Sequence, residues 1–136
     1  MLHSQERCYD VLAVLPKRIL VADDSDTVRR SVNSYLTQRD FDVCGEAIDG
    51  EHTIEKAWEL KPDLILLDVA MPRTNGIVAA SVLKEMMPNV RIVLFTMYSE
   101  SVARAFAHKG LAVDAVIAKA DAMSRLAECL QSLLPS

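Results

Sequence analysis

The chain has 136 residues, of which 51% are hydrophobic and 25% are charged, and this length is sufficient for one domain with its own hydrophobic core. The net charge of −4, with no stretch in which lysine and arginine cluster, argues against direct binding of nucleic acid by this segment. The 3 cysteines form no C-x-x-C pair, so neither a disulfide framework nor a zinc site is indicated. No apolar run reaches the roughly 18 residues of a membrane span, so we expect a cytoplasmic protein with no membrane partner.

Strands and helices are expected to alternate, because apolar runs of strand length separate longer stretches of helical periodicity. In chain order, the expected elements are a strand at 18–22, a helix at 27–38, a strand at 41–47, a helix at 51–60, a strand at 63–67, a helix at 77–87, a strand at 90–95, a helix at 99–108, a strand at 113–118 and a helix after Asp121. Ser25 or Asp26 can cap the first helix, and Pro62 and Pro88 end the second and third.

This alternation predicts an α/β fold, a doubly wound three-layer (βα)5 sandwich. Three of the strands are nearly continuous apolar runs, as expected for a parallel sheet that is covered by helices on both faces. Right-handed crossovers follow from the parallel pairing, but periodicity leaves the order of the strands open. Residues 1–17 belong to no such pattern and are treated as an N-terminal extension of unknown role, so the domain is expected to span 18–136.

Polar residues stand where the expected strands end. Asp23 and Asp24 follow the first strand, Asp68 follows the third, Thr96 follows the fourth and Lys119 follows the fifth. Ligand sites of open α/β sheets form beyond the carboxyl ends of the strands, so these residues can converge on one edge. Each residue alone has a simpler explanation, as a helix cap, a strand residue or a surface lysine, and only the combination is informative.

Three carboxylates at one point repel each other and call for a cation. Mg²⁺ suits them, since it binds carboxylates and water and leaves room for phosphate oxygens. With a lysine and a threonine hydroxyl opposite, the pattern indicates a phosphoryl-transfer site that works by charge placement.

The stretches Ile19-Leu20-Val21-Ala22-Asp23-Asp24 and Asp68-Val69-Ala70-Met71-Pro72-Arg73-Thr74-Asn75-Gly76, with Thr96 and Lys119, resemble the motifs of bacterial response-regulator receiver domains. The resemblance spans residues 18 to about 134. It implies a flavodoxin-like sheet of order 2-1-3-4-5 and a phosphorylation switch rather than an enzyme. Asp68 would accept the phosphoryl group from a sensor histidine kinase and so change the binding of an output partner.

The same resemblance assigns roles to single residues. Asp24, Asp68 and the main-chain carbonyl of Ala70 would bind Mg²⁺ directly, and Asp23 would act mostly through water. Lys119 would pair with the carboxylate and then with the phosphoryl group, and the Thr96 hydroxyl would bind a phosphoryl oxygen. Pro72 and Gly76 would shape the neighbouring loop, and Ala70, which has no polar side chain to orient water, predicts slow self-dephosphorylation.

Two positions depart from the common family pattern, and both affect how phosphorylation would be coupled to an output partner. Val116 stands where relatives often carry an aromatic residue, and Ala120 follows the lysine where many have proline. The second departure is similar to receivers that precede a helix-turn-helix domain, so a transcription-factor half cut before its DNA-binding domain is one alternative. The final Leu-Leu-Pro-Ser resembles no linker and favours a stand-alone regulator. The surface of residues 99–108, 113–118 and the last helix is the candidate face for a partner or a homodimer.

Two further alternatives belong to other classes. An inert receiver-like scaffold would lack one of the acidic residues or the lysine, and none is missing here. A flavin-binding protein of similar architecture would need a phosphate-binding loop after the first strand, where this chain has Asp23-Asp24-Ser25-Asp26.

Overall fold

The computed structural model describes residues 17–71, 76–96, 113–119 and 122–134, with no side-chain detail for 122–124. The elements in these ranges are β1 (Arg18–Ala22), α2 (Asp26–Thr37), β2 (Asp42–Ala47), α3 (Gly50–Leu60), β3 (Leu64–Asp68), α4 (Gly76–Met86), β4 (Arg91–Thr96), β5 (Ala115–Ala118) and α6 (Ala122–Leu133). The helix expected at 99–108 lies outside the described residues. Among the helices that are described, none is both long enough and apolar enough to cross a membrane.

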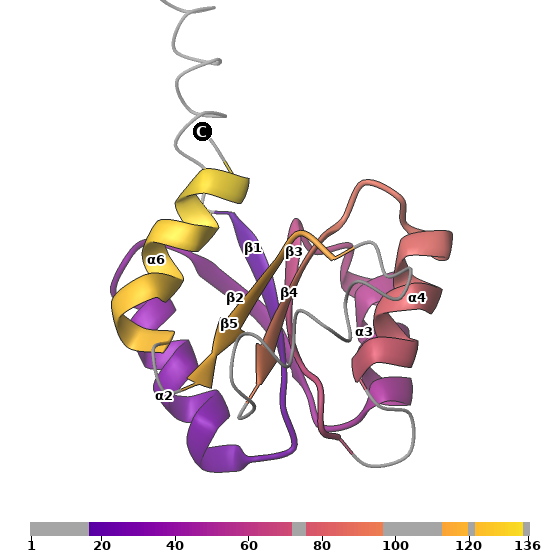
Figure 1. The fold of residues 1–136 in the computed structure, drawn as a ribbon, viewed down its shortest axis with the longest axis horizontal. Coiled ribbons are helices and arrows are strands. Elements are labelled where there is room, and N and C mark those ends of the chain that lie inside the picture. Colours follow the sequence, from indigo (N-terminus) through magenta and orange to yellow (C-terminus); the bar gives the residue numbers. More distant parts are fainter. Residues whose placement is uncertain (1–16, 72–75, 97–112, 120–121, 135–136) are drawn as a thin grey trace, which may run out of the picture.

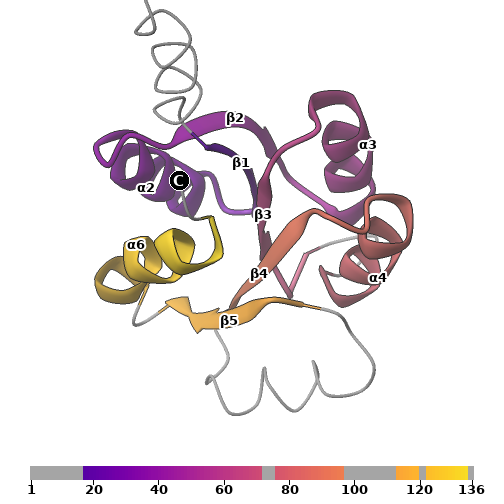
Figure 2. The ribbon, with the colours of Figure 1, turned by 90° about the horizontal axis from the view of Figure 1, so that it is seen from above.

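The five strands form one parallel sheet (Figure 1) in the order β2-β1-β3-β4-β5 (Figure 2), which confirms the predicted fold class and strand order. The register aligns the carboxyl ends of the three central strands. Ala22 of β1 pairs with Leu67 of β3, and Asp68 pairs with Phe95 of β4. Residues that follow these strands therefore lie along a single edge of the sheet.

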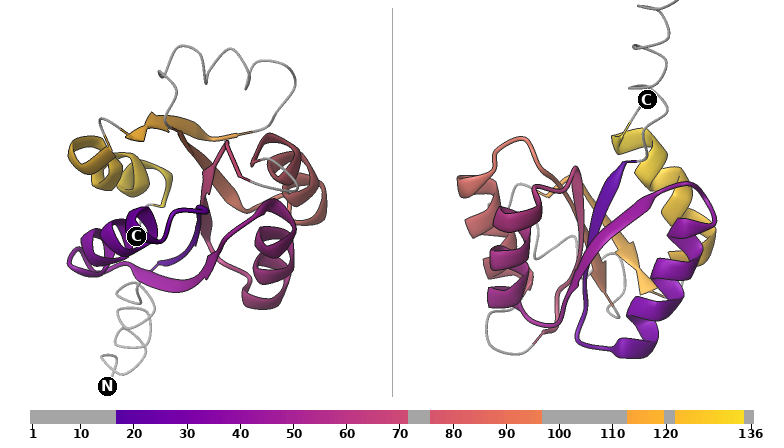
Figure 3. Two further views of the ribbon diagram at one scale, coloured as in Figure 1. Left: turned by 90° about the horizontal axis from the view of Figure 1, so that it is seen from below. Right: turned by 180° about the vertical axis from the view of Figure 1, so that it is seen from behind.

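Helices cover both faces of the sheet, with α2 and α6 on one side and α3 and α4 on the other (Figures 2 and 3). Because successive strand residues point to opposite faces, each strand supplies both cores. Ile19 and Val21 of β1 pack in the core beneath α2 and α6, whereas Leu20 packs in the core beneath α3 and α4. Val116 packs in this second core, on the face opposite to its neighbour Ile117.

Side-chain caps define the first residues of α2 and α3, the helices that follow the carboxyl ends of β1 and β2. Ser25 caps α2, since its hydroxyl oxygen accepts a hydrogen bond from the Val28 amide at 3.3 Å. Asp49 caps α3 in the same way and accepts from the His52 amide at 2.7 Å. At the other end of α3, Lys61 adopts a left-handed conformation, with φ of 50°, which ends the helix before Pro62.

The fifth strand begins at Ala115, two residues later than expected, and Asp114 lies just before it. The Asp114 carboxylate accepts a hydrogen bond from the Ile92 amide at 2.8 Å and forms ion pairs with Lys84 at 3.2 Å and Arg91 at 3.3 Å. This network ties the start of β5 to the end of α4 and the start of β4, at the edge opposite the polar cluster. The other expected elements that are described agree with the structure to within one residue at each predicted end.

Candidate functional site

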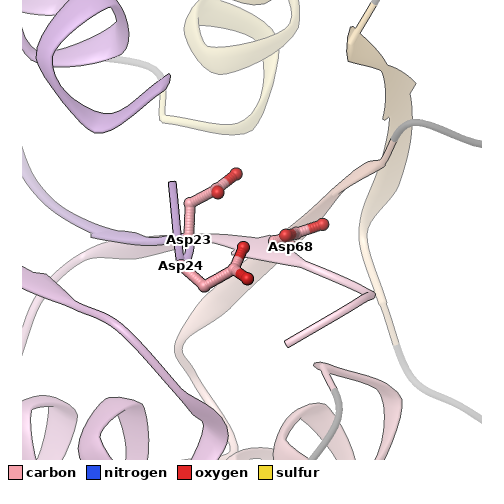
Figure 4. A group of neighbouring side chains, drawn as sticks. All are labelled: Asp23, Asp24 and Asp68. Atoms are coloured by element: carbon pink, nitrogen blue, oxygen red, sulfur yellow. The ribbon is translucent and has the colours of Figure 1, made fainter. Parts of the chain in front are cut away.

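Three carboxylates gather at the carboxyl edge of the sheet (Figure 4). Asp23 and Asp24 follow β1, and Asp68 ends the adjacent β3. One carboxylate oxygen from each residue lies within 4.8 Å of the others. Asp23 is 1% exposed and Asp68 is 2% exposed, whereas Asp24 is exposed to solvent. The cluster is therefore buried on one side and accessible on the other, as a site for a small ligand requires.

Lys119 is the cation that faces this cluster. Its Nζ lies 2.7 Å from Oδ2 of Asp23 and 3.4 Å from Oδ2 of Asp68. The buried Oδ2 of Asp23 nevertheless has no well-aligned hydrogen bond from any described group. Among the described residues, Lys119 is the one cation that forms an ion pair with any of these three carboxylates, and an oxygen-rich donor set of this kind suits Mg²⁺.

The environment of Asp68 holds its proton more tightly than water would. Burial, and secondarily the charge of Asp23, raise the pKa of the Asp68 carboxyl to about 6, although Lys119 and a 3.3 Å hydrogen bond from the Ala70 amide oppose the change. The carboxylate form still dominates at pH 7, by a factor of about 10. Asp68 is thus a buried carboxyl group that is mainly ionised at pH 7.

Thr96 and Ala70, two further residues of the predicted site, also lie at this edge of the sheet. Thr96 is the last residue of β4, is fully buried, and pairs in the sheet with Ala118, the residue before Lys119. Ala70 is exposed and follows Asp68 by two residues, and its backbone amide contacts the Asp68 carboxylate. Pro72 lies outside the described residues.

Gly76 supports the loop that follows Asp68. An added Cβ at this position would lie 2.0 Å from the main-chain oxygen of Asp68 and 2.9 Å from Cα of Val69. The Gly76 amide donates to the Val69 oxygen at 2.9 Å, so α4 begins in direct contact with the end of β3. Only glycine permits this approach of one backbone to another.

One side chain near the site was not found from the sequence. Arg29 of α2 donates from Nη1 to the main-chain oxygen of Asp23 at 2.7 Å and from Nε to Glu46 of β2 at 3.0 Å. The sequence offers two adjacent arginines, Arg29 and Arg30, and no local pattern distinguishes the one that turns toward the acidic loop. The sequence also contains no pattern that assigns Glu46, on the neighbouring strand β2, to the surroundings of the site.

Comparison with known proteins extends these observations. Residues 19–131 match the family model of the response regulator receiver domain. The response regulator protein VraR of Staphylococcus saprophyticus is 42% identical over 120 residues, which cover 86% of this chain and 56% of that protein. The chain therefore spans about half the length of the curated relatives it matches.

Solved structures with the same architecture include two from Thermotoga maritima. The response regulator domain of CheB has a TM-score of 0.76 and 28% identity, and the match covers 87% of this chain and 96% of that one. The response regulator TrrA, solved in complex with Mg²⁺ and a beryllium fluoride, has a TM-score of 0.77 and 28% identity over 87% of this chain and 99% of that one.

Proposed function

The chain belongs to the response regulator receiver family, and on that premise we propose that it is switched by transfer of a phosphoryl group to Asp68. The donor is the phosphohistidine of a sensor histidine kinase. The burial of Asp68, its raised pKa and its place between an acidic pair and Lys119 support this assignment. The chain acts as a signalling switch that promotes its own phosphorylation and dephosphorylation.

In the proposed step, a carboxylate oxygen of Asp68 attacks the phosphorus atom. An O–P bond forms, the P–N bond to the kinase histidine breaks, and the imidazole nitrogen leaves with the electron pair. The ionised form of Asp68 is required, and it is the major form at pH 7. Lys119 already contacts Oδ2 of Asp68, so its ammonium is placed to pair with the anionic phosphoryl group.

The acidic cluster fits a divalent cation of the Mg²⁺ type. Asp24, Asp68 and the main-chain carbonyl of Ala70 would hold it directly, with Asp23 acting mostly through water. The excess of carboxylates over ammonium groups among the described residues supports this assignment. A bound Mg²⁺ would neutralise charge on the carboxylates and on the phosphoryl oxygens during transfer.

The switch would be reported by Thr96. Thr96 ends β4 at the same edge as Asp68, and its hydroxyl group would bind a phosphoryl oxygen. This contact would draw the residues after Thr96 toward the site. The receiving surface would include β5 and α6, and an output partner or a second copy of the chain would bind there. Residues 99–108, which we also expect at this surface, lie outside the described residues. The output partner is a protein or a further domain of the same chain, in the cytoplasm.

The observation that carries this proposal is the buried contact of Asp68 with Lys119 beside Asp23. The test is incubation of the protein with acetyl phosphate and Mg²⁺, followed by intact mass measurement. We expect wild type to gain one phosphoryl group, and Asp68→Asn to gain none. Asp40→Asn, which changes an exposed carboxyl outside the site, is the matched control and retains the gain. Phosphorylation of Asp68→Asn at the wild-type level would refute the assignment.

A second candidate function is the regulatory half of a DNA-binding transcription factor. It is favoured by the partial coverage of VraR: this chain covers 56% of that protein, so that relative has room for a further domain outside the matched region. In that case the receiver would control a domain that contacts DNA, while this segment itself would make no nucleic-acid contact. Sequencing of the gene downstream of codon 136 tests the candidate, since a continuing frame that encodes a helix-turn-helix is expected.

A further inference from the structure

The side chain of Arg29 turns back from α2 and joins three parts of the chain. Nη1 donates to the main-chain oxygen of Asp23 at 2.7 Å, Nε donates to Oε1 of Glu46 at 3.0 Å, and Nη2 donates to Oδ1 of Asp26 at 3.1 Å. The side chain is only 13% exposed. Arg29 therefore connects the loop of the acidic pair with the start of α2 and with the edge strand β2.

The oxygen that Arg29 holds belongs to the peptide between Asp23 and Asp24. A peptide group is planar, so a hydrogen bond that holds its carbonyl also orients the N–H and the Cα of Asp24, which lie in the same plane. The preceding peptide is anchored independently, because the Asp23 amide donates to the Ala47 oxygen at 3.0 Å. The Asp23 side chain is anchored as well, since its Oδ1 accepts from the Ser25 amide at 2.8 Å.

Asp24 has no comparable support of its own. Its carboxylate is exposed and makes no hydrogen bond or ion pair with any residue that the structure describes. No described group therefore fixes this carboxylate directly, so its position depends on the backbone that carries it, and it lies with Asp23 and Asp68 in one cluster (Figure 4). The contact that holds the Asp23–Asp24 peptide is the Arg29 hydrogen bond.

We propose that Arg29 is a positioning residue for the divalent-cation site, which orients Asp24 through the Asp23–Asp24 peptide. Glu46 holds the guanidinium group in place from β2. This inference rests on the proposed function, because it assumes that the acidic cluster binds Mg²⁺. It adds to that function a residue that contacts neither the cation nor the phosphoryl group and that acts through the backbone of a ligand.

The chemistry of arginine fits this task better than that of lysine. The guanidinium group presents several N–H donors in one rigid plane, so a single side chain can bind a carbonyl and two carboxylates at once. Arg30 provides a natural comparison, because it follows Arg29 directly in α2 but is 80% exposed and pairs only with Asp26, at 2.6 Å, among the described residues. Both residues carry the same charge, and only Arg29 reaches the acidic loop.

The test is a calorimetric titration of the full chain with Mg²⁺, together with a metal-free thermal melt of each variant. Loss of residues that orient metal ligands costs about 10- to 100-fold in metal affinity, so we expect this loss for Arg29→Gln. Glu46→Gln and Arg29→Lys should give a smaller weakening of Mg²⁺ binding. Arg30→Gln, the matched control, should keep the wild-type Kd to within about twofold. In NMR spectra, the Asp24 amide signal of metal-free Arg29→Gln should differ from wild type, and that of Arg30→Gln should not.

These measurements distinguish a positioning effect of Arg29 from a general loss of fold stability and from the loss of one positive charge. If Arg29→Gln lowers the melting temperature but binds Mg²⁺ with the wild-type Kd, the inference is overturned. It is also overturned if Arg30→Gln weakens Mg²⁺ binding as much as Arg29→Gln does, because charge alone would then suffice. If Arg29→Gln fails to fold, Glu46→Gln decides, and an unchanged Kd there counts against the inference. Absence of Mg²⁺ binding by wild type would refute the proposed function itself, and this inference with it.

Discussion

Replacement of Asp68 by asparagine should stabilise the metal-free protein at neutral pH. The Asp68 carboxyl is buried and lies beside Asp23, and its pKa is raised from 3.8 to about 6. The folded state therefore keeps this proton at pH values where the unfolded chain has released it. Stability falls as the pH rises from about 4 to about 6, because the folded protein must then carry a buried charge that the unfolded chain carries in water.

The size of the effect follows from the same two pKa values. A difference of 2.2 between 3.8 and 6, at 1.36 kcal/mol for each pH unit, corresponds to about 3 kcal/mol. The side-chain amide introduced by Asp68→Asn cannot ionise, so the variant is free of this penalty, and Lys119 keeps its 2.7 Å contact with Asp23. The free energy of unfolding of the variant, minus that of wild type, should therefore rise by about 2 kcal/mol between about pH 4 and pH 7, and the rest of the total of about 3 kcal/mol develops below about pH 4.

Urea denaturation in the presence of a chelator, repeated across this pH range, measures the difference directly. Because other carboxyl groups titrate in both proteins, only the difference between variant and wild type is informative. Asp40→Asn is the control, since it removes an exposed carboxyl outside the site. A difference for Asp68→Asn that is flat with pH, or a variant less stable than wild type at pH 7 without metal, would contradict the argument.

Three further predictions concern the loop, the cation and the lifetime of the signal. Gly76→Ala should destabilise the fold by about 3 kcal/mol in urea denaturation, because its Cβ meets the Asp68 backbone. Gly45→Ala should cost less, because its Cβ meets only the ends of two leucine side chains. Mg²⁺ at 100 times its Kd should stabilise wild type by about 2.7 kcal/mol in thermal melts, and Asp24→Asn should lose most of that gain; equal gains in both proteins would exclude Asp24 as a ligand. Ala70→Asn should shorten the life of the phosphorylated protein, followed by mass measurement over time, because the added amide can orient water; a longer life would count against this prediction.

The sequence by itself determined the elements and the composition of the site. Apolar runs of strand length, separated by stretches with a helical period, predicted the five strands and the described helices to within two residues. They could do so because each pattern reflects which face of an element is buried. The acidic pair, Asp68, Thr96 and Lys119 could be assigned to one edge without knowledge of the strand order, since every parallel strand ends on the same side. The order itself came only from the family resemblance.

Tertiary structure decided which groups touch, because contacts between distant segments depend on how the elements cross and not on local periodicity. Two adjacent arginines differ by one helical step, yet packing against β2 buries Arg29 beside the acidic loop and leaves Arg30 in solvent. The raised pKa of Asp68 has the same origin, since burial and a neighbouring carboxylate act only once β1 and β3 are paired. A sequence pattern records the preference of a residue for the interior, whereas the charge it meets there is set by the chain segments that fold around it.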